Sequence, residues 1–91
     1  MLTRRLVHVQ EKAALHFERA AKAGDPTAAG SMGQMYSHGV GVPQNNETAL
    51  RYFRQGELSG DAASLNGLGY LYLYGMGVER SFDRAAKYFH K

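Results

Sequence analysis

Side chains that could act as an acid, a base or a metal ligand are few, and they do not converge. A catalytic site needs such groups close together, and a metal site needs ligands at hairpin or i, i+4 spacing. The four histidines, His8, His16, His38 and His90, occupy unrelated positions of the sequence. No set of His, Asp and Glu residues has the spacing of metal ligands. Cysteine is absent, which excludes thiol catalysis and disulfides. The sequence therefore predicts no enzyme, no cofactor and no metal.

Two glycine-rich segments invite comparison with phosphate-binding loops: Gly39–Pro43 and Gly75–Val78. Phosphate loops follow a strand, and the spacing Gly-x-x-x-x-Gly-Lys-Ser/Thr is missing here. The glycines instead supply positions that can take positive φ, and Pro43 cannot continue a helix. We predict that both segments connect helices.

Charge gives no sign of a nucleic-acid or membrane surface. The 91 residues carry 11 basic and 8 acidic side chains, and never more than two basic residues in a row. Basic residues on the predicted helices have acidic neighbours, as Arg51, Arg54, Arg84 and Lys87 do in Glu47, Glu57 and Asp83. No apolar run approaches the roughly 18 residues of a membrane span. We predict neither a nucleic-acid partner nor membrane contact.

The chain repeats itself with an offset of 36 residues and no insertion or deletion. Equivalent residues include Gly33 and Gly69, Tyr36 and Tyr72, Gly39 and Gly75, Gly41 and Gly77, and Val42 and Val78. Self-similarity at this period is typical of stacked supersecondary units. We predict one repeat domain over residues 1–91: a partial leading repeat at 1–24, a repeat at 25–60, and a repeat at 61–91 that is incomplete at its C-terminal end.

Local signals divide these units into helices. Apolar residues at i, i+3, i+4 spacing, N-capping Asp, Asn or Ser, and terminal glycines mark each one. The predicted helices are Gln10–Ala23, with residues 1–9 a truncated edge that extends it, Asp25 to about His38, Asn46 to about Ser59, Asp61–Tyr74, and a last helix capped by Ser81. Either Asn45 or Asn46 caps the third. The fold class is all-α, a right-handed solenoid of αα-hairpins with five helices.

The pattern also predicts a core and close helix contacts. The expected core residues are Phe53, Leu65, Leu68, Leu71, Tyr72, Phe82, Tyr88 and Phe89. Glycine inside a helix costs about 1 kcal/mol relative to alanine. We expect close approach of a neighbouring helix to explain Gly33 and Gly69, whereas Gly56 should weaken its helix by that amount.

The recurring signature is a small residue, Leu-Gly, Tyr, Gly-x-Gly-Val, and a second helix that opens Ala-x-x-Tyr/Phe-Phe. It resembles the SEL-one-like repeat family, relatives of the tetratricopeptide repeat, over roughly residues 10–91. The resemblance implies a non-catalytic scaffold for protein–protein interaction. Val42–Phe53 and Asn66–Val78 resemble, more specifically, the lumenal adaptors of the HRD ubiquitin ligase. That likeness implies a role in endoplasmic-reticulum-associated degradation, with ligase subunits or misfolded clients as partners; the alternative is a cytosolic or bacterial signalling scaffold.

The segment Asn46-Glu47-Thr48 matches an N-glycosylation sequon, which fits the lumen of the endoplasmic reticulum. Capping of a helix by Asn46 explains the same residue without a glycan. A cytoplasmic location is therefore the alternative to the lumenal one.

Comparison of the two repeat units, position by position, leaves one candidate recognition patch. Tyr70, Leu73 and Tyr74 stand where the earlier unit has Gln34, Ser37 and His38. The three share a helix face, and first helices usually line the concave surface of two-helix solenoids. We predict a partner-binding patch of Tyr70, Leu73 and Tyr74 with Gln34 and His38; the alternative is that the aromatic residues pack on a neighbouring helix.

The ends of the solenoid lack an evident polar capping helix, which stacked repeats need. Phe82, Tyr88 and Phe89 have no following unit to cover them. We therefore predict self-association, end to end or by exchange of a terminal helix.

Overall fold

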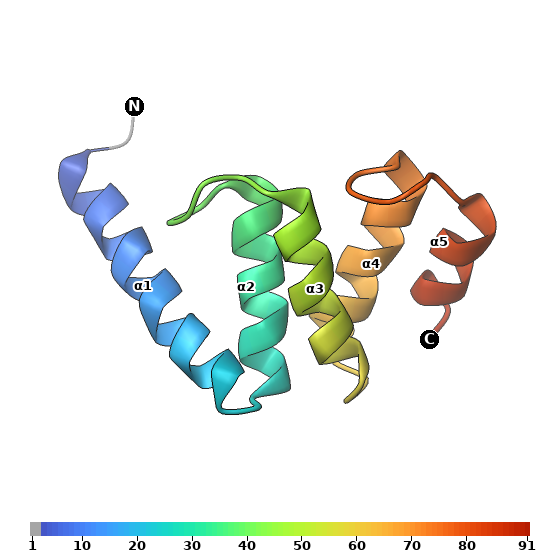
Figure 1. The fold of residues 1–91 in the computed structure, drawn as a ribbon, viewed down its shortest axis with the longest axis horizontal. Helices are drawn as coiled ribbons and strands as arrows, with labels where there is room; N and C mark the ends of the chain where they lie inside the picture. The colour runs from blue at the N-terminus through green and yellow to red at the C-terminus, as the bar shows by residue number, and fades with distance from the viewer. Residues whose placement is uncertain (1–2) are drawn as a thin grey trace.

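The computed structural model describes residues 3–91, which form five α-helices and no strand. The helices are α1 Arg4–Lys22, α2 Pro26–His38, α3 Asn46–Glu57, α4 Ala62–Tyr74 and α5 Phe82–Phe89. They stand side by side in chain order, and α2 also contacts α4 across the row (Figure 1). This confirms the all-α solenoid of αα-hairpins with five helices.

Side-chain caps set where the helices begin. The Thr3 hydroxyl accepts from the Leu6 amide at 3.2 Å, so α1 starts at Arg4 and takes up most of the predicted edge segment; Met1 and Leu2 lie outside the described residues. The Asn45 side chain accepts from the Thr48 amide at 3.1 Å. Asn45 is therefore the cap of α3, and the alternative that Asn46 caps it is wrong.

The two connectors after α2 and α4 have matching conformations. Gly39 and Gly75 end these helices in the left-handed region, with φ of 69° and 66°. That conformation is strained for a residue with a Cβ atom, so glycine here lets the chain leave the helix at once. The hairpin geometry is thereby repeated from one unit to the next.

Phe53 lies at the centre of the packed helices, with 1% of its surface exposed. Its ring fills the space left by two glycines, Gly33 on α2 and Gly67 on α4, because a Cβ atom at either would overlap the ring. Leu68 and Leu71 of α4 are buried against it. Close helix approach thus accounts for Gly33, as the repeat pattern predicts.

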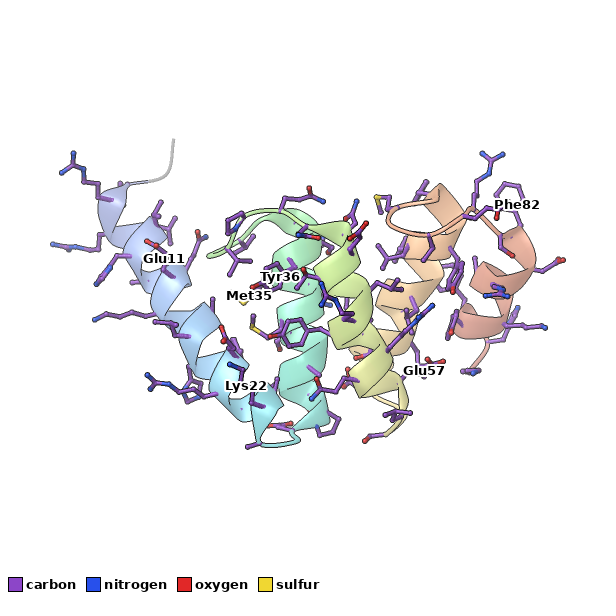
Figure 2. The ribbon with its side chains drawn as sticks, in the orientation of Figure 1. Glu11, Lys22, Met35, Tyr36, Glu57 and Phe82 are labelled. Carbon is purple, nitrogen blue, oxygen red and sulfur yellow. The ribbon has the colours of Figure 1, made fainter. Side chains whose placement is uncertain are left out.

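The predicted core is wrong at its C-terminal edge. Phe82 is 62% exposed and points away from the helices at the end of the row (Figure 2). Phe89 is 40% exposed, although its ring covers Gly69, and Tyr88 and Leu65 are half-buried. The physical reason is that α5 packs against α4 alone.

A buried pair changes the predicted effect of Gly56. A Cβ atom at Gly56 would overlap the side chain of Ser64, which is fully buried and donates to Asp61 Oδ2 at 2.7 Å. The residues 36 positions earlier are Ala20 and Ala28. The smaller Gly56 thus accommodates the larger Ser64, and this overlap opposes the gain in helix propensity that alanine would bring at position 56.

We expect Gly56→Ala to lower the free energy of unfolding by about 1–2 kcal/mol, because overpacking outweighs the gain in helix propensity. In a Ser64→Ala background part of this loss should disappear, since the closer overlap, with the Ser64 hydroxyl, is removed while the Cβ atom of residue 64 stays. Urea denaturation of the four proteins in a double-mutant cycle measures the coupling. Equal effects of Gly56→Ala in both backgrounds would contradict the explanation.

Candidate protein-interaction site

A hollow of about 420 Å³ lies between α2 and α4. Its walls differ in character, since α2 contributes polar side chains and α4 contributes aromatic rings. The residues that line it are Gln34, Ser37, His38, Phe53, Asn66, Gly67, Tyr70, Leu71, Tyr74 and Met76. Four of the five residues predicted as the partner patch therefore meet at one concavity.

The aromatic wall is partly prearranged. The rings of Tyr70 and Tyr74 stack with centroids 6.3 Å apart and planes within 3°. Tyr74 is 63% exposed, whereas Tyr70 is 46% exposed and meets Phe89 edge-on at 5.2 Å. Tyr70 is thus partly exposed, as the predicted patch requires, and also packs on a neighbouring helix, as the alternative prediction has it. Tyr74 is the more exposed of the two rings.

The polar wall is fixed by bonds within α2. His38 Nδ1 donates to the Gln34 carbonyl at 2.9 Å, and the Ser37 hydroxyl donates to the same carbonyl at 3.1 Å. These bonds hold the last turn of α2, where side chains can reach the orphan carbonyls. Gln34 also lines the hollow with its side chain, whose amide makes none of these bonds.

Leu73 differs from its predicted partners. It is half-buried and does not line the hollow. Ser37, Asn66, Gly67 and Met76 line it as well, and the sequence pattern did not predict them for the patch; Phe53 and Leu71, which also line it, were predicted only as core residues. Gly67 could have indicated this part of the hollow in the sequence. It is a glycine in mid-helix without a counterpart in the earlier unit, which implies a local need for space.

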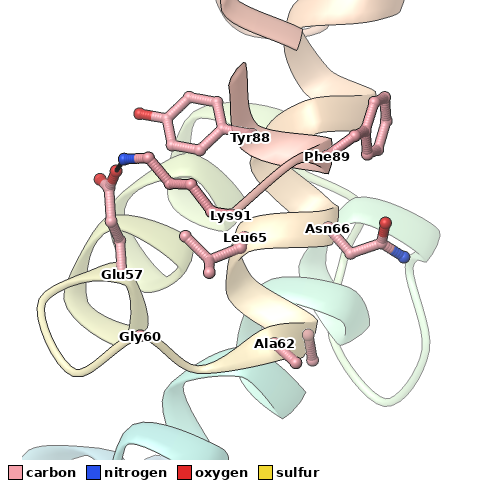
Figure 3. Close-up of a pocket in the computed structure, with 9 residues that line it drawn as sticks. Glu57, Gly60, Ala62, Leu65, Asn66, Tyr88, Phe89 and Lys91 are labelled. Atoms are coloured by element: carbon pink, nitrogen blue, oxygen red, sulfur yellow. Dashed lines mark ion pairs between the residues drawn. The ribbon is translucent and has the colours of Figure 1, made fainter. Parts of the chain in front are cut away.

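A second hollow, of about 710 Å³, lies at the C-terminal edge (Figure 3). Lys91 reaches toward Glu57 on α3, with Nζ 3.8 Å from Oε2, while Leu65 and Asn66 of α4 form another side. In the equivalent place one unit earlier, Gly30 leaves room for Asp61, Ala63 and Ser64 at the start of α4. Asn66 stands at the position of that glycine here, so another helix could not pack against the C-terminal edge as closely as α4 packs against Gly30.

A metal site needs a cluster of ligating side chains, and a membrane span needs a long apolar helix. Residues 3–91 hold no cluster of three His, Asp or Glu side chains that could bind a metal ion. Within the same residues, no helix is long and apolar enough to cross a membrane.

Comparison with known proteins agrees with this geometry. The model of the Sel1 repeat matches three consecutive segments, residues 6–25, 26–61 and 62–91. The chain belongs to the Sel1 repeat family. Such repeats are scaffolds for protein–protein interaction and share the helical solenoid fold described above. No curated protein matches the chain significantly.

Two solved bacterial structures are similar to this Sel1 repeat chain. One is a Sel1 repeat protein from Oxalobacter formigenes, with 30% identity, a TM-score of 0.85, and coverage of 89% of this chain and 23% of that one. The other is a protective antigen present in uropathogenic Escherichia coli strains that displays an SLR fold, with 28% identity, a TM-score of 0.83, and coverage of 88% and 17%. The chain thus spans less than a quarter of either relative.

Proposed function

We propose that this Sel1 repeat chain is a non-catalytic scaffold that binds a partner protein in the hollow between α2 and α4. The supporting observation is the exposed, stacked pair Tyr70 and Tyr74 opposite the polar end of α2. Aromatic side chains that border a concavity supply large contact area at low entropy cost, and they are enriched among residues that dominate binding energy.

The hollow defines what the partner presents. Its volume of about 420 Å³ and its floor of Phe53 and Leu71 suit one or two apolar side chains. The amide groups of Gln34 and Asn66 can pair with backbone N–H and C=O groups of the same segment. The partner is therefore a short protein segment with an apolar anchor and no requirement for charge.

We expect Tyr74→Ala to weaken binding of that partner by about 2 kcal/mol, or roughly thirtyfold, because an exposed ring at the mouth of the hollow is lost. The tagged protein is used to recover partners from a lysate of its own source, and the affinity of each partner is then measured by calorimetry. Phe82→Ala is the matched control, since Phe82 is 62% exposed and lies outside the hollow. Equal losses in both variants would place the contact elsewhere.

Two settings for the scaffold have separate support. Likeness of Val42–Phe53 and Asn66–Val78 to lumenal adaptors supports a role as a segment of a ubiquitin-ligase adaptor in endoplasmic-reticulum-associated degradation, with ligase subunits or misfolded clients as partners. The alternative is a bacterial or cytosolic signalling scaffold, which is supported by the bacterial origin of both similar structures.

Glycan occupancy separates these settings. Asn46 opens α3, accepts from Gln44 Nε2 at 2.8 Å and lies against Gly77. A glycan would be attached to Nδ2, which leaves Oδ1 free to accept from Gln44, so these contacts are compatible with either setting. Mass spectrometry of the protein from its own source distinguishes them; an occupied Asn46 would support the lumenal setting.

We also propose that the C-terminal edge mediates self-association. Phe82 and Phe89 are exposed at this edge. The side chain of Asn66 occupies the space that a further helix would need to pack as closely as α4 does at Gly30. Contact through the aromatic rings of α5 is the arrangement that remains. Light scattering over a concentration series should show a rising mean mass, and Phe82→Ala with Phe89→Ala should reduce it. A monodisperse monomer at high concentration would contradict the proposal.

A further inference from the structure

Two guanidinium groups meet at the hydroxyl of Tyr72. Arg54 Nη2 of α3 and Arg84 Nη1 of α5 both donate to Tyr72 Oη, at 3.3 and 3.4 Å. The Arg84 guanidinium also lies over the Tyr72 ring, 5.6 Å from its centroid. A neutral phenol accepts these hydrogen bonds without neutralising either charge. The pair therefore keeps its capacity to bind an anion.

Arg84 and Tyr72 border a hollow of about 490 Å³ beside the connector that follows α4, whereas Arg54 reaches this place only through its hydrogen bond to Tyr72 Oη. Arg80, Ser81 and Arg84 line it, and Glu79 is the one carboxylate among its lining residues. The ion pairs recorded within residues 3–91 are Lys22 with Glu18 and Lys91 with Glu57. None of the three arginines takes part in them, so their charges are not matched by a carboxylate at ion-pair distance.

The hydrogen bonds also act on Tyr72 itself. They lower the pKa of its hydroxyl, with the bond from Arg54 as the largest cause and that from Arg84 next. The phenolate would be stabilised here because positive charge surrounds the oxygen. The same surroundings would stabilise an oxyanion brought by a ligand.

The positive charge is an addition to the repeat. Thirty-six residues before Arg54, Arg80 and Arg84 stand Glu18, Gln44 and Thr48. The earlier set holds one carboxylate, whereas the later set holds three guanidinium groups and the carboxylate of Glu79, where the earlier connector has Pro43. The charge of the side chain is thus more positive at each of these three positions than at its equivalent in the earlier unit.

Packing does not explain this change. Tyr36 stacks on Tyr52 with centroids 5.7 Å apart and planes at 13°, and Tyr72 stacks on Tyr88 with the same values. The hairpin therefore forms in the same way with Glu18 and Thr48 as with Arg54 and Arg84. The arginines add two hydrogen bonds to Tyr72 Oη and local positive charge, and the charge is what points to a ligand.

We propose that Arg54, Arg80 and Arg84 form a binding site for an oxyanion, a phosphate or carboxylate group carried by a partner protein. The planar fork of each guanidinium matches the paired oxygens of such groups. The site goes beyond the hollow between α2 and α4, because Tyr72 is two residues from Tyr70 and Tyr74 and so faces roughly the opposite side of α4. A partner that occupies both would span α4.

The test uses the ¹⁵N-labelled protein and follows the arginine Nε–H signals and the amide of Tyr72 by NMR. Sodium phosphate is titrated against sodium chloride at equal ionic strength. Three peptides of one Gly/Ser sequence then follow, which carry phosphoserine, glutamate or serine at a central position. We expect saturable shifts at Arg54 and Arg84 with phosphate but not chloride. Stronger binding of the phosphoserine or of the glutamate peptide over serine identifies the source of the oxyanion.

Variants taken from the repeat itself locate the site. Arg54→Glu, Arg80→Gln and Arg84→Thr restore the residues found 36 positions earlier, and together they should weaken phosphate binding at least about tenfold. Arg84→Gln alone, a change on the exposed face of α5, should weaken it several-fold without a threat to folding. Lys12→Gln removes one exposed charge on α1 and is the control; it should leave binding unchanged.

Two results would overturn the proposal: equal shifts with phosphate and chloride, or equal phosphate affinity of the wild type and the Arg84→Gln variant. The outcome is independent of the function proposed for the other hollow. The Tyr74→Ala variant should bind phosphate as tightly as the wild type does. This holds even if the variant no longer binds the apolar partner of the other hollow.

Discussion

Replacing Phe53 by alanine is expected to lower the free energy of unfolding by about 3–5 kcal/mol. Phe53 of α3 is 1% exposed, and its ring packs against Gly33 of α2 and Gly67 of α4, so it joins three helices. Its removal leaves a cavity lined by two glycines, which have no side chains that could relax into the space. A domain of this length is stabilised by only about 0.05–0.15 kcal/mol per residue. The variant should therefore lose a large share of its stability.

Thermal denaturation followed by circular dichroism measures this effect, since about 1 kcal/mol shifts the Tm of such a domain by roughly 4–8 °C. Phe82→Ala is the matched control, because Phe82 is the same residue type at 62% exposure. Its Tm should change little. Similar Tm losses in the two variants would mean that Phe53 is not the centre of the packing.

Gly33→Leu is expected to destabilise the fold by about 3 kcal/mol, and Gly69→Leu, the equivalent change one unit later, by about 1 kcal/mol. A Cβ atom at Gly33 would overlap the Phe53 ring, which is enclosed by α4 on its other side. A Cβ atom at Gly69 would overlap Phe89, which is 40% exposed and can swing toward solvent. The repeat makes the two glycines equivalent, but their neighbours differ in freedom.

Urea denaturation of both variants gives the comparison, and the order of the two effects is what matters. The alanine variants at the same positions serve as a check, because they carry the overlap without the extra bulk. A Gly69→Leu variant as unstable as Gly33→Leu would show that Phe89 is held as firmly as Phe53. An unchanged free energy of unfolding in either case would mean that the glycine does not limit helix approach.

Much of the fold follows from local chemistry that the sequence displays. Asp25, Asn45, Asp61 and Ser81 accept hydrogen bonds from the first turn of their helices, and Gly39 and Gly75 end α2 and α4. These interactions join residues a few positions apart, so residue type and spacing are sufficient to predict them. The 36-residue repeat then implies that such hairpins stack.

The candidate site was predictable only in part. Tyr70, Tyr74, Gln34 and His38 were found by comparison of the two units, and they meet at one hollow. Leu73 shares the helical spacing but not the hollow. Spacing fixes the angular position of a side chain on its own helix, whereas the crossing of α2 over α4 decides which part of that face is covered.

Residue types and their spacing were sufficient to predict the repeat, the five helices and the resemblance to the repeat family. Only the packed helices show that Gly56 makes room for Ser64, that Phe82 stays exposed, and that Arg54 and Arg84 meet at Tyr72. The physical reason is distance along the chain. Caps and turns depend on near neighbours, but space, exposure and the meeting of charges depend on side chains from different helices, whose positions are fixed only when the helices pack.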